Sequence, residues 1–254
     1  MASFDPNELG TKERHSLLLG AIAPRPIALV STVDEFGHNN LSPFSFFNIF
    51  SSNPPVVIFS AARRVRDNTT KDTLHNAMQQ KEVVINVVNY AITQQVNLSS
   101  AEYSSDVDEF VKSGLTPIAS DLVAPRRVKE SPVSLECEVR DVLHMGEEGG
   151  AGNLVMCVVK RMHIADDVLL EDGGIDQDAI DLVGRMGKAW WVRASGDALF
   201  ELAPPKLGIG VDQIPDVIRR STILTGNNLG QLGAEISRPT PEEVETKKED
   251  FNVR

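Results

Sequence analysis

The feature that most constrains the fold of this chain is a series of short apolar runs rich in β-branched residues, each bounded by turn residues. They cover residues 26–33, 41–50, 55–60, 82–88, 133–143, 154–164 and 190–193. Runs of this length and composition are typical of β-strands. Residues 34–37 can close a hairpin with Gly37 at positive φ, and the glycine-rich residues 147–153 separate two long strands.

Helical patterns are shorter and fewer than the strand patterns. Asp72 can cap an amphipathic helix that ends before residue 82. Asp106 can cap a second helix over residues 107–113, with Gly114 as the left-handed residue after it. Because strands dominate, we predict a mainly β fold, a β-barrel with peripheral helices, in preference to a doubly wound sheet.

The chain of 254 residues is long enough to bury one sizeable core. We predict one main domain over residues 1–205 and a C-terminal arm over residues 206–254. The arm mixes short helical patterns with several glycines. It ends in a charged tail over residues 241–254, which has little apolar surface to bury.

A formal net charge of −11 limits the partners that this chain can bind. It disfavours nucleic acids and anionic lipid surfaces, so small molecules are the expected partners. No apolar run is long enough to cross a bilayer, and the first residues lack the pattern of a secretion signal. We therefore expect a cytoplasmic protein without membrane association.

Cysteines and histidines form no recognisable reactive or metal site. Cys137 and Cys157 lie inside apolar runs, where we expect small buried hydrophobes. The five histidines show no metal-binding spacing, so no metal is expected. Nucleophile-elbow and dinucleotide-fingerprint motifs are absent too, so no catalytic side chain is predicted.

A basic segment stands out in this acidic chain. Three arginines and Lys71 fall within residues 63–71, directly before the helix predicted from Asp72. The positive end of a helix and its unpaired N–H groups favour a phosphate. By charge alone the segment fits a solvated basic loop equally well. The point charge of Lys71 beside the hydroxyl of Thr73 favours the phosphate site.

A second candidate site is the run of alternating aromatic and hydroxyl residues over residues 41–55. On one strand, Phe44 and Phe46 would share one face, and Ser45 and Phe47 the other. A core strand with its polar side toward water has this pattern. A flat amphipathic ring such as isoalloxazine also needs an apolar floor with polar groups beside it, and this strand offers both.

Arg25 is the third feature, because the flanking Pro24 and Pro26 make its backbone extended and stiff. A guanidinium oriented in this way could stabilise negative charge on the N1/O2 side of a flavin, or pair with a carboxylate. A surface arginine in a rigid turn is an equally good interpretation of this tripeptide.

At these residues the sequence resembles the flavin reductase-like, FMN-binding split-barrel family. This family includes flavoredoxins and the reductase components of two-component monooxygenases. The similarity covers most of the chain. It consists of short matching segments, called words here, that follow one another in order at residues 24–33, 42–48, 51–57, 71–74, 109–110, 114–116, 131–133, 135–137, 183–185 and 224–230.

The resemblance implies an FMN-binding split barrel that forms a homodimer, with one FMN in each of two clefts near the subunit interface. For the ring and ribityl chain it implies contacts from Arg25, Ser45, Phe46, Phe47, Ser52 and Asn53. For the phosphate it implies Ser60, Lys71, Asp72 and Thr73. Arg185 belongs to a matching word and is expected at the cofactor.

One departure from the family pattern follows Arg185. Where members of the family often have glycines and then a tyrosine, residues 186–191 read MGKAWW. Either Trp191 takes the place of the tyrosine near the flavin, or the cleft is reshaped.

The function that the resemblance implies is hydride transfer from NAD(P)H to FMN. Electrons would then pass to a small-molecule acceptor or to an oxygenase partner. No side chain needs to act as an acid or base in this reaction. The alternative is an FMN-binding electron carrier or storage protein without efficient NAD(P)H turnover, which would use the same binding residues.

Overall fold

The computed structural model describes residues 1–205 and 207–235 and divides the chain into two compact units, Met1–Leu199 and Phe200–Arg254. The sequence placed this boundary between residues 205 and 206. The charged tail predicted over residues 241–254 lies outside the described residues. None of the helices in the described part is long and apolar enough to cross a membrane.

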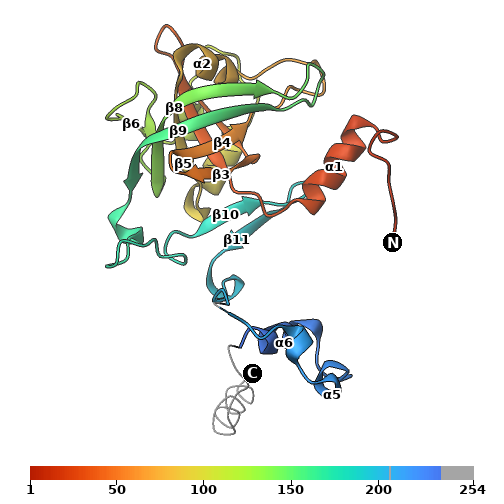
Figure 1. Cartoon of the computed structure of the whole chain (residues 1–254). Helices are drawn as coiled ribbons and strands as arrows, with labels where there is room; N and C mark the ends of the chain where they lie inside the picture. Colours follow the sequence, from red (N-terminus) through yellow and green to blue (C-terminus); the bar gives the residue numbers. More distant parts are fainter. Residues whose placement is uncertain (206, 236–254) are drawn as a thin grey trace. The chain divides into compact units, whose positions relative to one another are not determined.

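The first unit is built on a seven-stranded antiparallel sheet in the order β2-β1-β5-β8-β9-β4-β3 (Figure 1). Its strands are β1 Ala28–Val33, β2 Asn39–Phe44, β3 Phe47–Ser52, β4 Pro55–Ser60, β5 Glu82–Val87, β8 Val133–His144 and β9 Asn153–Ile164. The predicted mainly β fold is confirmed. The turn between β1 and β2 has Gly37 at φ 86°, as the sequence predicted.

The sheet curls into a barrel because its two edge strands are consecutive in the chain. β2 and β3 lie at opposite ends of the strand order, yet only Ser45 and Phe46 connect them. Three Cα steps from Phe44 to Phe47 span at most about 11 Å. The two edges must therefore lie next to each other there, although no strand ladder joins β2 to β3 in the described sheet.

The prediction of a single strand over residues 41–50 is therefore wrong. The chain turns at Ser45 and Phe46, and this turn resets the alternation of side chains. Phe44 and Phe47 both pack against the same core cluster, whereas Phe46 is 39% exposed and contacts the ring edge of His15. The sequence could not show the break, because both strands carry aromatic residues at the turn.

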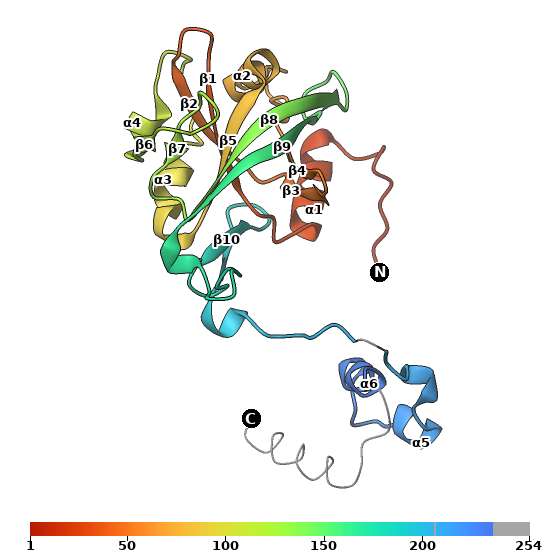
Figure 2. The same cartoon turned by 60° about the vertical axis from the view of Figure 1, so that its left-hand side comes forward.

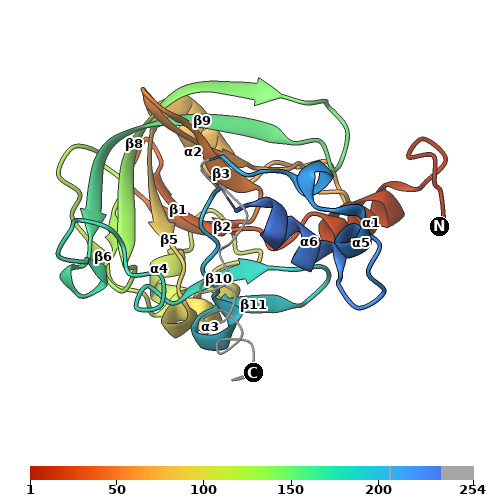
Figure 3. The same cartoon turned by 60° about the horizontal axis from the view of Figure 1, so that its bottom comes forward.

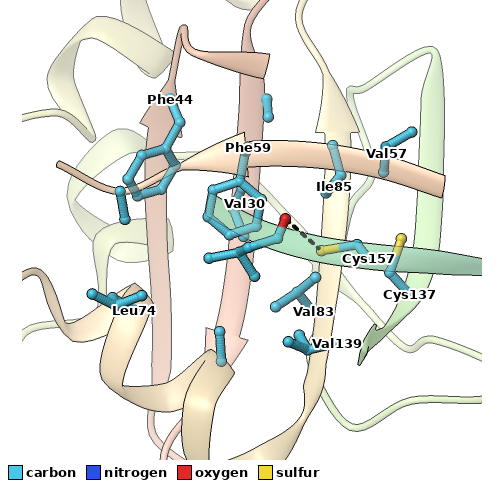
Figure 4. Close-up of a cluster of buried hydrophobic side chains, with 14 residues drawn as sticks. Val30, Phe44, Val57, Phe59, Leu74, Val83, Ile85, Cys137, Val139 and Cys157 are labelled. Atoms are coloured by element: carbon cyan, nitrogen blue, oxygen red, sulfur yellow. Dashed lines mark hydrogen bonds between the residues drawn. The ribbon is translucent and has the colours of Figure 1, made fainter. Parts of the chain in front are cut away.

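The barrel interior is filled by side chains from six of its strands, joined by Leu74 and Ala77 (Figure 4). Phe44 and the fully buried Phe59 are the largest side chains of this cluster, with ring centroids 5.1 Å apart. Cys137 and Cys157 are buried in the same cluster as free thiols, which confirms their predicted role. Burial raises the pKa of Cys137 to about 12 and also raises that of Cys157.

Helix α2, Asp72–Gln80, packs against β1 and β5 (Figure 2). Its N-cap is Lys71, one residue before the predicted Asp72. Asp72 is instead the first residue of the helix, where the positive end of the helix stabilises its negative charge. The first predicted helix thus begins one residue earlier than expected, whereas the second begins later. α4 spans Glu109–Ser113, and its N-cap is Asp108 instead of Asp106, because the Asp108 carboxylate accepts the N–H of Phe110 at 2.8 Å.

A separate two-stranded ribbon of β10 Leu182–Arg185 and β11 Trp191–Ala194 lies beside the main sheet (Figure 3). Main-chain bridges join it to the barrel at Arg25 and Asn89. The remaining elements are α1 Thr11–Ala21, α3 Thr93–Leu98, β6 Pro117–Ile118, β7 Arg127–Val128, α5 Asp216–Arg219, α6 Gly226–Gly233 and 3-10 turns at Tyr90–Ile92, Asp166–Val168, Gly196–Ala198 and Val211–Gln213.

We expect Phe59→Ala to lower the free energy of unfolding by about 3–5 kcal/mol, because the change leaves a cavity at the centre of the barrel. Urea denaturation of the variant and the parent measures this loss. Phe36→Ala is the control, since Phe36 is 76% exposed and its removal should change stability by no more than about 0.5 kcal/mol. Equal losses in the two variants would contradict the central place of Phe59.

Candidate functional site

Two cavities adjoin along β2. The larger, here called the Trp191 cavity, has a volume of about 210 Å³ and is lined by Ile27, Pro43, Ser45, Val96, Asn97, Ser100, Arg185 and Trp191. The smaller, here called the Lys71 cavity, is lined by Asn40, Ser42, Arg64, Lys71, Asp72, Thr73, Ser100, Ala101, Glu102, Tyr103 and Glu109. Ser100 lines both, so the two cavities are neighbours, and together they form the candidate site.

Lys71 reaches into its cavity from the N-cap of α2. Its Nζ donates to Ser42 Oγ at 2.8 Å and lies 4.9 Å from the centroid of the Phe44 ring. Burial lowers the pKa of Lys71 and the nearby charge of Arg64 lowers it further, while the charges of Glu109 and Glu102 partly oppose this shift. No ion pair found within residues 1–205 and 207–235 includes Lys71. A largely desolvated cation without a carboxylate partner favours an anionic ligand.

The arginines of the basic segment are occupied by other groups. Arg64 and Arg66 both pair with Glu102, at 3.4 and 2.9 Å. Arg63 donates to the side chain and the main-chain carbonyl of Asn68. Of the predicted basic segment, Lys71 is thus the residue most available to an anion.

Thr73 lines the cavity, but its hydroxyl hydrogen is already used within the protein. The side chain is buried and donates to Asn40 Oδ1 at 2.6 Å. Asn40 in turn donates to Glu109 Oε1 at 3.1 Å, and Glu109 Oε2 accepts the N–H of Leu41 at 3.0 Å. Burial raises the pKa of Glu109. Thr73 and Asp72 can still offer their main-chain N–H groups, which have no acceptor within the helix at its first turn.

The Trp191 cavity combines an apolar floor with polar walls. Ile27, Pro43 and Val96 supply apolar surface, and Arg185 is the one charged residue that lines it. The Arg185 guanidinium lies 4.9 Å from the Trp191 ring and donates to the carbonyl of Lys188 at 2.9 Å. The structure thus brings together three predicted cofactor residues here, namely Ser45, Arg185 and Trp191.

Arg25 lines neither cavity. It is 6% exposed, which makes the interpretation as a surface arginine wrong. Its Nη1 donates to the carbonyls of Leu19 and Ile22 at 2.8 and 2.6 Å, and its Nη2 donates to the carbonyl of Met186 at 2.9 Å. Burial and the nearby charge of Arg185 lower the pKa of Arg25. Its guanidinium therefore ties the end of α1 to the β10–β11 turn.

The other predicted residues lie outside both cavities. Phe46 occupies the turn between β2 and β3, and Phe47 packs against the barrel core. Ser52 and Asn53 are exposed where β3 turns into β4, and Ser60 is buried at the end of β4. Contacts from these five residues to a cofactor stay predictions from the resemblance.

Sequence reasoning missed several residues of the site. Ser42 lies in a matching word but was not assigned to the cofactor, although the Lys71 contact makes it central to the smaller cavity. Asn40, Asn97 and Ser100 were also missed. Nothing in the local sequence marks the residues of α3, because only the fold brings that helix against β2.

A third cluster, of Asp121, Glu136 and His163, has the ligand types of a metal site. The buried Glu136 carboxylate already accepts from the main-chain N–H groups of Asp121 and Leu122, at 2.8 and 2.7 Å, and contacts His163 Nε2 at 2.6 Å. These contacts use three of the carboxylate's roughly four acceptor sites, so the cluster anchors the loop at residues 121–122 to β8.

Comparison with known families identifies the chain. The model of the flavin reductase like domain matches residues 20–177. The chain belongs to this family. The resemblance seen in the sequence is confirmed, and membership supports a flavin cofactor and an oxidoreductase role. Arg185 and Trp191 follow the matched residues, so their place at the site rests on the geometry above.

Individual proteins agree with this assignment. A Halalkalibacterium halodurans protein is 38% identical over 185 residues, which cover 72% of this chain and 88% of that protein. The structure of nitrilotriacetate monooxygenase component B from Bacillus cereus is 31% identical and covers 80% of this chain and 98% of that one, with a TM-score of 0.74. A Shewanella frigidimarina protein with a split barrel domain is 28% identical and covers 80% of this chain and 100% of that one, with a TM-score of 0.68.

Proposed function

We propose that this flavin reductase family member is an FMN-dependent NAD(P)H oxidoreductase. In this proposal the Lys71 cavity binds the FMN phosphate and the Trp191 cavity binds the flavin ring. The observation that carries it is the largely buried Lys71, which lacks a carboxylate partner in the described chain and lies next to a second cavity with an apolar floor.

The donors in the Lys71 cavity fit a phosphate. Lys71 supplies a positive charge, and the first turn of α2 supplies main-chain N–H groups at the positive end of the helix. Ser42 Oγ accepts its hydrogen bond from Lys71, which leaves its own hydrogen free to donate to a phosphate oxygen. Together these groups match the oxygens of a phosphate without any change of rotamer in Thr73.

The Trp191 cavity fits a flat ring with polar edges. Ile27, Pro43 and Val96 can contact the face of the ring, while Ser45, Asn97 and Ser100 offer hydrogen-bonding groups. The cavities adjoin at Ser100, so one ligand can extend from the phosphate donors to the apolar floor.

When bound, FMN supplies the centre that accepts a hydride from NAD(P)H and passes electrons to an acceptor. The protein's own residues bind and orient the cofactor, and none in the Trp191 cavity is an acid or base. The Bacillus cereus relative is named as a component of a monooxygenase. This supports an oxygenase partner as one acceptor for this chain, with small-molecule acceptors as the other class.

We also propose that the protein is a homodimer. Strand β3 is an edge of the sheet, and its Ile49 and Phe50 are each 64% exposed. Apolar residues on a free edge favour association with another copy. The cytoplasmic location stays a prediction from the sequence.

The visible spectrum of the purified protein tests the proposed function. We expect FMN-loaded, yellow protein that bleaches rapidly when NADH or NADPH is added without oxygen. Yellow protein that does not bleach would support the electron carrier instead. Protein that takes up no FMN would contradict both.

We expect Lys71→Ala to weaken FMN binding by about 1.5–3 kcal/mol, the scale of a hydrogen bond to a charged group. Fluorescence quenching gives the Kd of FMN. Riboflavin, which lacks the phosphate, should bind parent and variant equally. The exposed Lys129 offers a control, because Lys129→Ala removes the same charge at a residue that lines neither cavity. Equal FMN affinity in parent and Lys71→Ala protein would remove Lys71 from the site.

Alkaline pH should weaken FMN binding. Only the protonated Lys71 attracts a phosphate, and its pKa is lowered, so its charge is lost at a lower pH than that of an exposed lysine. The Kd of FMN should therefore rise as the pH rises through this lowered pKa. Lys71→Arg should bind FMN over a wider alkaline range, because arginine keeps its charge. Identical pH profiles for the two proteins would contradict the prediction.

A further inference from the structure

We propose that Arg185 is the cation that stabilises negative charge on the flavin ring, and that Arg25 is the positioning residue that holds Arg185 at the Trp191 cavity. This inference rests on the proposed FMN site. From the sequence, the stabilisation of flavin charge was attached to Arg25. Here Arg185 stabilises that charge, and Arg25 positions Arg185.

The first step is the pairing of the two arginines. The N–H of Arg25 donates to the carbonyl of Arg185 and the N–H of Arg185 donates to the carbonyl of Arg25, each at 2.9 Å. Residues that exchange both bonds in an antiparallel pair place their side chains on the same face. Neither takes part in an ion pair within the described residues. Two positive charges thus lie together without a carboxylate, in a chain of net charge −11.

The second step separates their roles. Arg25 has both terminal nitrogens engaged with main-chain carbonyls, is 6% exposed and lines neither cavity. Arg185 lines the Trp191 cavity, and among the described residues its guanidinium donates one hydrogen bond, to the carbonyl of Lys188. A guanidinium has five N–H donors, so most of those of Arg185 are available to a ligand. Arg185 is therefore the group that can contact the ring.

The third step is the orientation of Arg185. Its guanidinium lies over the Trp191 ring, with Cζ 4.9 Å from the ring centroid, and this contact holds it at the cavity. A flat cation with free N–H donors matches the carbonyl and nitrogen edge of the flavin ring, where negative charge gathers on reduction. The attraction is larger for the reduced ring than for the neutral oxidised ring, so Arg185 raises the reduction potential of bound FMN.

The fourth step is how Arg25 keeps Arg185 in position. Its Nη2 bonds the carbonyl of Met186, the residue after Arg185, while its Nη1 bonds two carbonyls of the α1 end. The two segments are in close contact, because a Cβ on Gly184 would lie 3.1 Å from Pro24 Cβ and 3.3 Å from the Arg25 carbonyl. Without the hydrogen bonds from the Arg25 guanidinium, the β10–β11 turn would be free to move and Arg185 would shift.

An anaerobic potentiometric titration of the FMN-loaded full chain tests the role of Arg185. We expect Arg185→Met to reduce the preference for reduced over oxidised FMN about tenfold, which lowers the potential of this two-electron couple by about 30 mV. The Kd of oxidised FMN should change less than threefold. Arg193→Met is the matched control, because Arg193 also stacks on an aromatic ring, Tyr90, but is paired with Asp181. Its potential should equal that of the parent.

Arg25 is tested with two variants. If Arg25 acts by position, Arg25→Lys should lower the potential as Arg25→Met does, because lysine keeps the charge but cannot form the same fork to three carbonyls. If Arg25→Lys keeps the parent potential while Arg25→Met lowers it, the charge of Arg25 itself acts on the ring and the positioning role is overturned.

The outcomes separate this inference from the proposed function. Parent protein that binds no FMN would refute the proposed function. FMN-loaded Arg185→Met with an unchanged potential would overturn only the role of Arg185, as would folded Arg185→Met that no longer retains oxidised FMN. Should Arg185→Met fail to fold, Arg185→Gln is the second neutral variant, and the same shift is expected for it.

Discussion

The two-residue connection between β2 and β3 is the constraint on which the rest of the structure depends. It joins the two edges of a seven-stranded sheet, so the sheet has to curl until those edges meet. The same curvature turns β2 toward α2, α3 and the β10–β11 ribbon. Asn40 and Ser42 line the Lys71 cavity, whereas Pro43 and Ser45 line the Trp191 cavity. Because side chains alternate along a strand, Asn40 and Ser42 lie on one face of β2 and Pro43 on the other, so the two cavities flank this edge strand.

Charge pairing separates binding residues from structural ones in this acidic chain. Arg64, Arg66 and Arg193 each have a carboxylate partner and need no ligand. Lys71 and Arg185 line cavities and take part in no ion pair of the described chain. They line two cavities that share Ser100, which agrees with the proposed ligand, a phosphate at one end and a polarisable ring at the other. Flavin family membership agrees with that distribution of charge.

Local signals in the sequence predicted those parts of the site that depend on neighbouring residues. The approach of Lys71 to a helix start was predictable, because basic residues and the helix pattern are adjacent in the chain. The orientation of Thr73 was not, because its acceptor Asn40 comes from a strand 33 residues away. The break at Ser45 and Phe46 was hidden too, since an apolar run looks alike whether it forms one strand or two.

The sequence by itself determined the mainly β class, the hairpin turn at Gly37, the buried state of both cysteines and the family of the chain. These follow from periodicity, turn chemistry and ordered motifs, all of which act over short stretches of chain. Only the tertiary structure decided that Arg25 is a buried clamp and that Arg185 lines the cavity. The carbonyl of Met186 that holds Arg25 lies 161 residues away in the sequence. Hydrogen bonds over that separation arise only when the barrel closes and brings the β10–β11 turn against the end of α1.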